Sequence, residues 1–94
     1  TRSLILTPET VTEDWLAGAW ETLAPEHFAP LVQLRPNVVL LGSGAKMRFP
    51  HPSLARALTE ARIGLEVMDT QAACRTYNIL VGEGRLVAAA VIVE

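Results

Sequence analysis

The residues best suited to chemistry lie between positions 66 and 80, where Glu66, Asp69, Cys74 and Arg75 occur together. Cys74 is the chain's single cysteine, and a positive charge such as Arg75 beside a thiol favours the reactive thiolate. A cysteine nucleophile also needs a base, and neither histidine of the chain is near it in sequence. We therefore favour a structural role for Cys74 over a catalytic one, with redox sensing as a further alternative.

Glu66 is the second candidate because it lies inside an apolar stretch, residues 63–68, whose pattern predicts a strand. A carboxylate in a buried strand is costly unless a positive charge or hydrogen bonds compensate it. Arg75 or Arg85 could form that ion pair. Without one, the carboxyl group would hold a proton and could serve as a general acid or base. We favour the structural ion pair over the acid–base role.

A third candidate is the turn Gly42-Ser43-Gly44, which follows the apolar run at residues 38–41. Ligands of α/β folds often bind at the carboxyl end of such a strand, and glycine-rich turns can direct backbone N–H groups at an anion. The dinucleotide-binding pattern is incomplete, however, because Met47 stands where its third glycine would be. We favour glycines that permit a tight turn, with a weak anion site as the alternative.

Composition limits the classes of function. The chain has 94 residues, which predicts a single domain over residues 1–94, and half of them are hydrophobic. That content, with a mean hydropathy of +0.28, argues against disorder and suggests that a partner protein or a second copy covers some apolar surface. The net charge is −2 and the basic residues are scattered, so we expect no nucleic-acid binding.

Metal, cofactor and membrane functions find little support in the sequence. His27, His51 and Cys74 are too far apart to form a zinc motif, and we expect no metal and no cofactor. No apolar run approaches the ~20 residues that span a bilayer, so we expect no stable membrane insertion. Residues 1–10 lack the apolar core of a signal peptide, and a single cysteine fits a reducing compartment. Together these features predict a cytoplasmic location.

The hydrophobic pattern predicts strands that alternate with helices. Strands are expected at residues 3–6, 38–41, 63–68 and 86–93, with a further short strand at 47–49 and irregular structure or short strands at 11–19. Helices are expected at residues 25–34, after Pro52, and from Asp69 or Thr70 to about residue 81. Helices that link buried strands imply a sheet with substantial parallel character.

The two later helices have apolar faces that can be assigned from helical spacing. In the helix after Pro52, the expected apolar stripe is Leu54, Ala57, Leu58 and Ala61. In the last helix, one face carries Ala72, Ala73, Thr76, Ile79 and Leu80, and the opposite face carries Cys74, Asn78 and Val81. Because the last helix is apolar almost all round, we expect it to be buried on more than one side.

Several motifs resemble those of a known family. They are VVLLGSG, then a Phe-Pro pair, then GLEVMDTQAACRTYNILVGEGRLVAAAVI. The chain resembles the small single-domain family that includes the mitochondrial NADH dehydrogenase (complex I) assembly factor 3 and the adipogenesis-associated domain protein. The resemblance implies a three-layer α/β domain with a central mixed sheet of about five strands flanked by helices. The resemblance implies no established enzymatic activity. It suggests that this chain is a bacterial cytoplasmic member of the family, in which only eukaryotic relatives are mitochondrial.

Two functions follow as hypotheses. The first is a non-enzymatic binding or assembly domain with a protein partner or with self-association, because no catalytic set of residues can be assembled. The second is a small-molecule or anion pocket, possibly a catalytic one, between the turn at residues 42–44 and the helix that starts at Asp69-Thr70. Glu66, Cys74 and Arg75 would be its polar groups.

Overall fold

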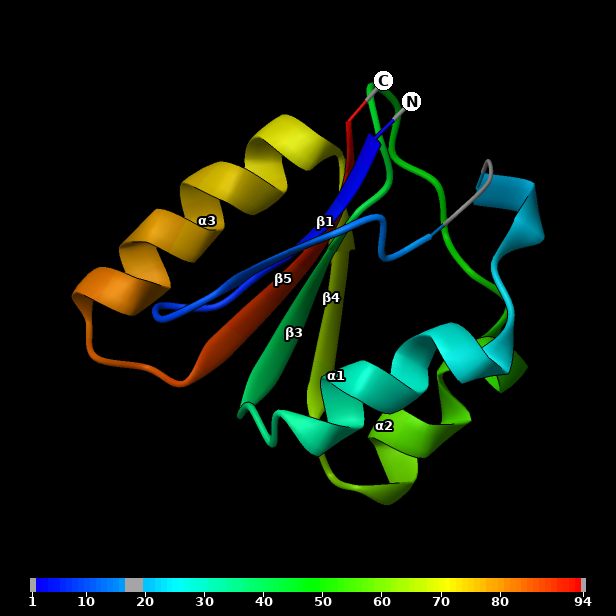
Figure 1. Cartoon of the computed structure of the whole chain (residues 1–94), viewed down its shortest axis with the longest axis horizontal. Coiled ribbons are helices and arrows are strands. Elements are labelled where there is room, and N and C mark those ends of the chain that lie inside the picture. Colours follow the sequence, from blue (N-terminus) through cyan, green and yellow to red (C-terminus); the bar gives the residue numbers. More distant parts are fainter. Residues whose placement is uncertain (1, 17–19, 94) are drawn as a thin grey trace.

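In the computed structural model, which describes residues 2–16 and 20–93, a five-stranded sheet lies between helices (Figure 1). The strands are β1 (Arg2–Leu6), β2 (Val11–Glu13), β3 (Val38–Gly42), β4 (Gly64–Met68) and β5 (Val87–Val93). The α-helices are α1 (Ala29–Gln33), α2 (Arg56–Glu60) and α3 (Thr70–Gly82), and short 3-10 helices are η1 (Trp20–Thr22), η2 (Pro25–Phe28) and η3 (Pro52–Ala55). Helix α3 covers one face of the sheet, and α1 and α2 cover the other. The expected three-layer α/β arrangement is confirmed.

The sheet is mixed, and its strands follow the order β2-β1-β5-β3-β4. Strand β3 runs parallel to both β4 and β5, as the helix-linked strands predict, while β1 runs antiparallel to β2 and β5. The last strand in sequence, β5, therefore lies in the middle and joins the amino-terminal hairpin to the parallel half.

Strands β3 and β5 are buried on both faces because helices cover both sides of the sheet. All five residues of β3 and the first six of β5 are buried. Alternate side chains enter two separate cores, as the period-2 geometry of a strand requires. Those on the α1 and α2 side include Val39, Leu41, Ala88, Ala90 and Ile92, and those on the α3 side include Val38, Leu40, Val87, Ala89 and Val91.

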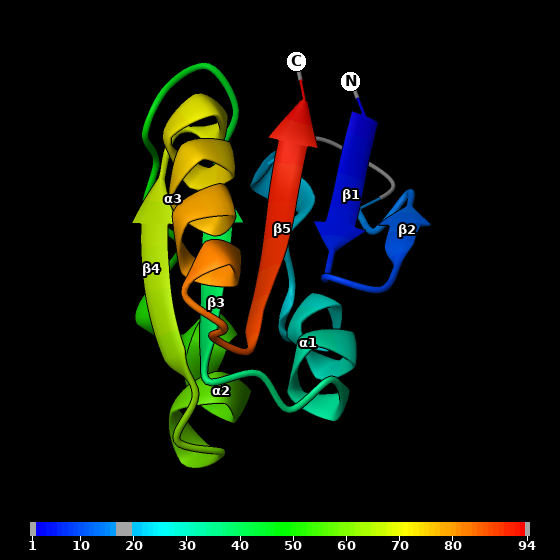
Figure 2. The same ribbon diagram turned by 90° about the vertical axis from the view of Figure 1, so that its left-hand side faces the viewer.

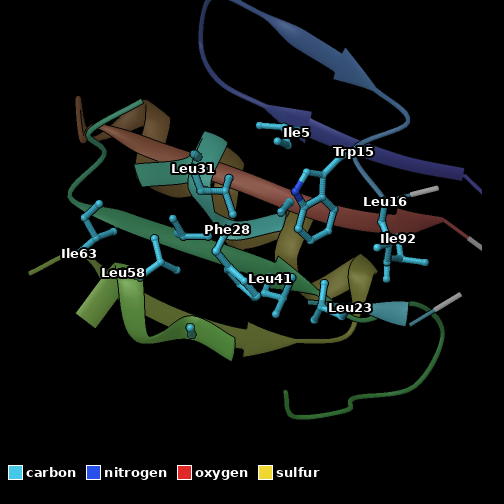
Figure 3. Close-up of a cluster of buried hydrophobic side chains, with 14 residues drawn as sticks. Ile5, Trp15, Leu16, Leu23, Phe28, Leu31, Leu41, Leu58, Ile63 and Ile92 are labelled. Atoms are coloured by element: carbon cyan, nitrogen blue, oxygen red, sulfur yellow. The ribbon is translucent and has the colours of Figure 1, made fainter. Parts of the chain in front are cut away.

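The larger core lies under α1 and α2 (Figure 3). Phe28, Leu31 and Leu58 are fully buried there and pack against the sheet. Trp15 joins them with its indole Nε1 donating a hydrogen bond of 2.7 Å to the backbone oxygen of His27, so its polar atom is satisfied inside the core. The stretch at residues 11–19 thus contributes strand β2 and a core tryptophan, while residues 17–19 lie outside the described residues.

Two predicted elements differ in the structure. Residues 47–49 form no strand. The Ser43 hydroxyl bonds the backbone oxygen of Lys46 and the N–H of Arg48, and these local hydrogen bonds fold the segment back toward the end of β3. The helix predicted at 25–34 is η2 followed by α1, and Pro30 is tolerated because it lies in the first turn of α1, where no helical N–H partner is lost.

Both predicted helix faces also need correction. In the segment after Pro52, the buried residues are Ala55 and Leu58, whereas Ala57 and Ala61 are exposed, because the first turn is 3-10 and shifts the spacing. Helix α3 packs on one side only, through Ala73, Cys74, Tyr77, Leu80 and Val81. Ile79 is 61% exposed, so the expectation of burial on more than one side is wrong within this chain. Helical spacing alone cannot identify the packed side of a helix that is apolar almost all round.

Gly42 allows the close approach of β3 to the start of α3, which generates a stability prediction. A Cβ at this position would lie 3.0 Å from Thr70 Cα and 3.0 Å from Val91 Cγ1. We expect Gly42→Ala to lower the free energy of unfolding by about 1–3 kcal/mol, since a backbone atom cannot move away cheaply. Denaturant unfolding measures this change.

Gly82→Ala is the matched control, because a Cβ there would meet nothing within 4 Å. Alanine favours the helix over glycine, so this variant should be unchanged or more stable by up to about 1 kcal/mol. Equal losses in the two variants would contradict the packing argument.

Candidate functional site

Ser43 organises the loop that leaves β3. The side chain is fully buried, and its hydroxyl donates to the backbone oxygen of Lys46 at 2.6 Å, with Met68 O also 3.2 Å away. The same hydroxyl accepts the backbone N–H of Arg48 at 2.9 Å, and the Ser43 amide donates to Met68 O. The hydroxyl thus has partners within the protein, and Ser43 positions the loop instead of presenting a group to a ligand.

Thr70 joins this loop to the helix and to β5. Its amide donates to Gly44 O at 2.9 Å, and its hydroxyl accepts from Gly44 N at 2.9 Å and donates to Ile92 O at 2.5 Å. Gly44 has a φ of 99°, a conformation that favours glycine. Asp69 is the cap of α3, because its Oδ1 accepts the N–H of Ala72 at 2.9 Å.

A surface depression of about 380 Å³ lies between the turn and the start of α3. Its lining residues are Gly44, Ala45, Asp69, Thr70, Gln71, Ile92 and Val93. The N–H groups of Gly44 and Thr70 already have protein partners, and the Asp69 side chain adds a carboxylate to the lining. An anion would therefore meet few free donors and an unfavourable charge here.

The other residues proposed for this pocket lie elsewhere. Neither Glu66, Cys74 nor Arg75 lines the depression, and Gly42 and Ser43 are buried beneath the surface. Cys74 is half-buried and packs against the core on the α3 side, while Arg75 is exposed. Cys74 occupies the kind of position that a structural cysteine takes.

Glu66 is exposed, contrary to the expectation of a carboxylate inside a core strand. The reason is topological: β4 is the outermost strand on its side of the sheet, and α3 packs mainly over β3 and β5. Among residues 2–16 and 20–93, the ion pairs are Arg2 with Glu13 and Arg48 with Glu21. The predicted pairing of Glu66 with Arg75 or Arg85 is therefore wrong.

Met47 and Phe49 are exposed apolar residues that the sequence pattern did not single out as functional. The two residues are 52% and 71% exposed and lie on either side of Arg48 in the sequence. The Arg48 guanidinium donates to the backbone oxygen of Ser43 at 2.7 and 3.2 Å and lies 5.4 Å from the centre of the Trp20 ring. The signal in the sequence was the apolar–basic–apolar alternation at residues 47–49, which is typical of a strand and here belongs to a fixed loop.

Ser43 provides a test of the loop's rigidity. We expect Ser43→Ala to cost about 1–3 kcal/mol of unfolding free energy, because it removes the hydroxyl that bonds the Arg48 N–H and the Lys46 carbonyl. Amide hydrogen exchange at Arg48 should also become faster. Ser53→Ala, which removes an exposed hydroxyl bonded to His51, should change stability by less than about 0.5 kcal/mol. An unchanged exchange rate at Arg48 would show that the hydroxyl does not hold the loop.

Neither a metal cluster nor a membrane-crossing helix is found in the described parts of the chain. No group of three or more His, Cys, Asp or Glu residues there could hold a metal ion. No helix there has the length and apolar character required to cross a bilayer.

Comparison with known proteins places this geometry among relatives. The chain is 42% identical to a Xanthomonas campestris protein solved by NMR, with a TM-score of 0.87 over 97% of this chain and 69% of that one. It is 37% identical over 90 residues to the mouse protein named NADH dehydrogenase [ubiquinone] 1 alpha subcomplex assembly factor 3, covering 94% of this chain. It is 28% identical over 72 residues to a Francisella tularensis protein named 13 kDa major membrane protein, covering 77% of this chain and 58% of that protein.

The extent of these matches defines what they establish. The chain spans 48% of the mouse assembly factor, so it corresponds to about half the length of that relative. The family model described as a protein of unknown function (DUF498/DUF598) matches residues 1–92, which is nearly the whole chain. This chain therefore belongs to the DUF498/DUF598 family.

Proposed function

We propose that this chain is a protein-binding domain that helps to assemble a protein complex and has no catalytic activity of its own. The observation that carries the proposal is the loop at residues 44–50, which holds Met47 and Phe49 exposed at 52% and 71%. The name of the mouse relative, an assembly factor of NADH dehydrogenase, supports the same kind of role.

The loop suits binding because its backbone is fixed before a partner arrives. Ser43 bonds the loop backbone at Lys46 and Arg48, and the Arg48 side chain returns to Ser43 O. A loop already held in one conformation loses little entropy on association. Methionine and aromatic side chains are enriched in protein interfaces, and aromatic residues often contribute much of the binding energy.

A second candidate is a small-molecule site in the depression between Gly44 and Gln71. Its position at the carboxyl end of β3 supports this reading, since α/β folds often bind ligands there. The Asp69 carboxylate in its lining favours a neutral or cationic ligand over an anion. Amide shifts at Gly44 and Gln71 in an NMR screen of small-molecule fragments would support this site, and their absence would count against it.

We place the assembly role in the bacterial cytoplasm. One relative is named a major membrane protein, so cell fractionation distinguishes between the two locations. Fractionation of cells that express the tagged chain should recover it with cytoplasmic markers, and recovery with the membrane pellet would overturn this location.

The assembly proposal is tested by removing the two exposed side chains together. We expect Met47→Ser/Phe49→Ser to reduce crosslinked capture of the partner at least tenfold, because a central aromatic anchor typically contributes about 2 kcal/mol or more. Stability should change by less than about 0.5 kcal/mol, since both side chains are exposed. Pull-down with mass spectrometry and denaturant unfolding make the two measurements.

The matched control is Val11→Ser/Leu86→Ser, which removes two side chains of similar exposure, 63% and 62%, outside the loop. This variant should keep the partner. A wild-type chain that captures no protein and remains monomeric at all concentrations would contradict the assembly proposal.

A further inference from the structure

Strand β4 leaves one edge of the sheet unpaired. Figure 2 shows β4 at the outer edge of the sheet, beside β3. The register of β4 with β3 runs from Gly64 opposite Val38 to Met68 opposite Gly42 without a bulge. Gly64 N donates to Asn37 O, and Met68 O accepts from Ser43 N, so alternate residues of β4 point their backbone groups at β3. In a parallel ladder, the residues between them point theirs away.

The groups at the open edge are the N–H and C=O of Leu65 and Val67. Within the part of the chain that the structure describes, no hydrogen bond uses them. The side chains of both residues are half-buried and pack against the larger core, so this edge offers two N–H and two C=O groups beside an apolar surface. Unpaired edges of this kind accept strands from other chains unless a charge, a proline or a bulge prevents it.

Glu66 lies at the centre of this edge, and its exposed carboxylate has no ion-pair partner among the described residues. A second copy that paired antiparallel would use all four free groups only if Leu65 faced Val67 of the other copy. That register sets Glu66 opposite Glu66, and like charges directly opposite each other are destabilising. The edge therefore disfavours pairing with a second copy of the chain and favours a strand that carries a positive charge opposite Glu66.

We propose that β4 accepts an extended segment of the partner protein as a sixth strand, with a lysine or arginine opposite Glu66. This inference rests on the proposed assembly function and specifies the chemistry of the partner. The residues that flank the basic one would face the side of the sheet where Leu65 and Val67 pack, so they should be apolar. The recognised pattern is apolar–basic–apolar in a strand, which is recognition by strand addition.

Two capped peptides test the proposal, Thr-Ser-Val-Lys-Val-Ser-Thr and the same sequence with glutamate replacing lysine. Titrated into the isotope-labelled chain, the lysine peptide should shift the Leu65 and Val67 amides most and bind about two- to fivefold more tightly than the glutamate peptide. Glu66→Lys should reverse that preference. Glu60→Lys, an exposed charge change on α2, should leave it intact.

Other results would overturn the proposal. These are equal binding of the two peptides, shifts that fall away from β4, or self-association of the wild-type chain in sedimentation together with shifts of its own Leu65 and Val67 amides. Capture experiments separate this inference from the assembly role. If Glu66→Lys keeps the captured partner while Met47→Ser/Phe49→Ser loses it, strand addition fails and the assembly role stands. If the lysine peptide binds β4 with the expected preference but no partner is captured, the assembly role fails, and strand addition stands as a property of the β4 edge alone.

Discussion

The hydrogen bonds of Thr70 are the constraint on which the carboxyl end of the sheet depends. One residue ties the loop after β3, the first turn of α3 and the end of β5 together, through its amide and its hydroxyl. The contact is close because Gly42 lacks a side chain at the point where β3 meets the helix. This junction fixes the start of the loop, and the hydrogen bonds of the Ser43 hydroxyl to Lys46 and Arg48 fix the path of its backbone.

The same junction explains why the turn is a poor anion site. Backbone N–H groups that could receive a ligand are used to join the elements, and the helix cap places a carboxylate beside them. The loop that carries Met47 and Phe49 begins beside the end of β4, because the Ser43 amide donates a hydrogen bond to Met68 O. The two surfaces proposed for partner binding, this loop and the edge of β4, therefore both lie at the β3–β4 end of the sheet. These are the surfaces that the proposed assembly role would use.

Much of the fold could be predicted because it follows from local patterns. The continuous apolar runs of β3 and β5 require helices on both faces, and Asp69 marks the start of α3 by its capping chemistry. The position of Glu66 could not be predicted, because an edge strand and a central strand can share one apolar pattern. Residues 47–49 alternate like a strand but pair with no strand in the described part of the chain. The packed side of α3 is determined by its contacts with the sheet and not by the helix sequence.

The central place of β5 also affects how the chain can fold while it is being synthesised. The hairpin of β1 and β2 and the parallel pair of β3 and β4 have no ladder between them until β5 enters. The sheet therefore cannot be completed until the ribosome has synthesised β5, which ends at residue 93. Before that point, the edges of β1 and β3 that pair with β5 are exposed. Exposed edges of this kind promote aggregation. A nascent chain with this strand order would therefore benefit from binding to a chaperone until its final strand emerges.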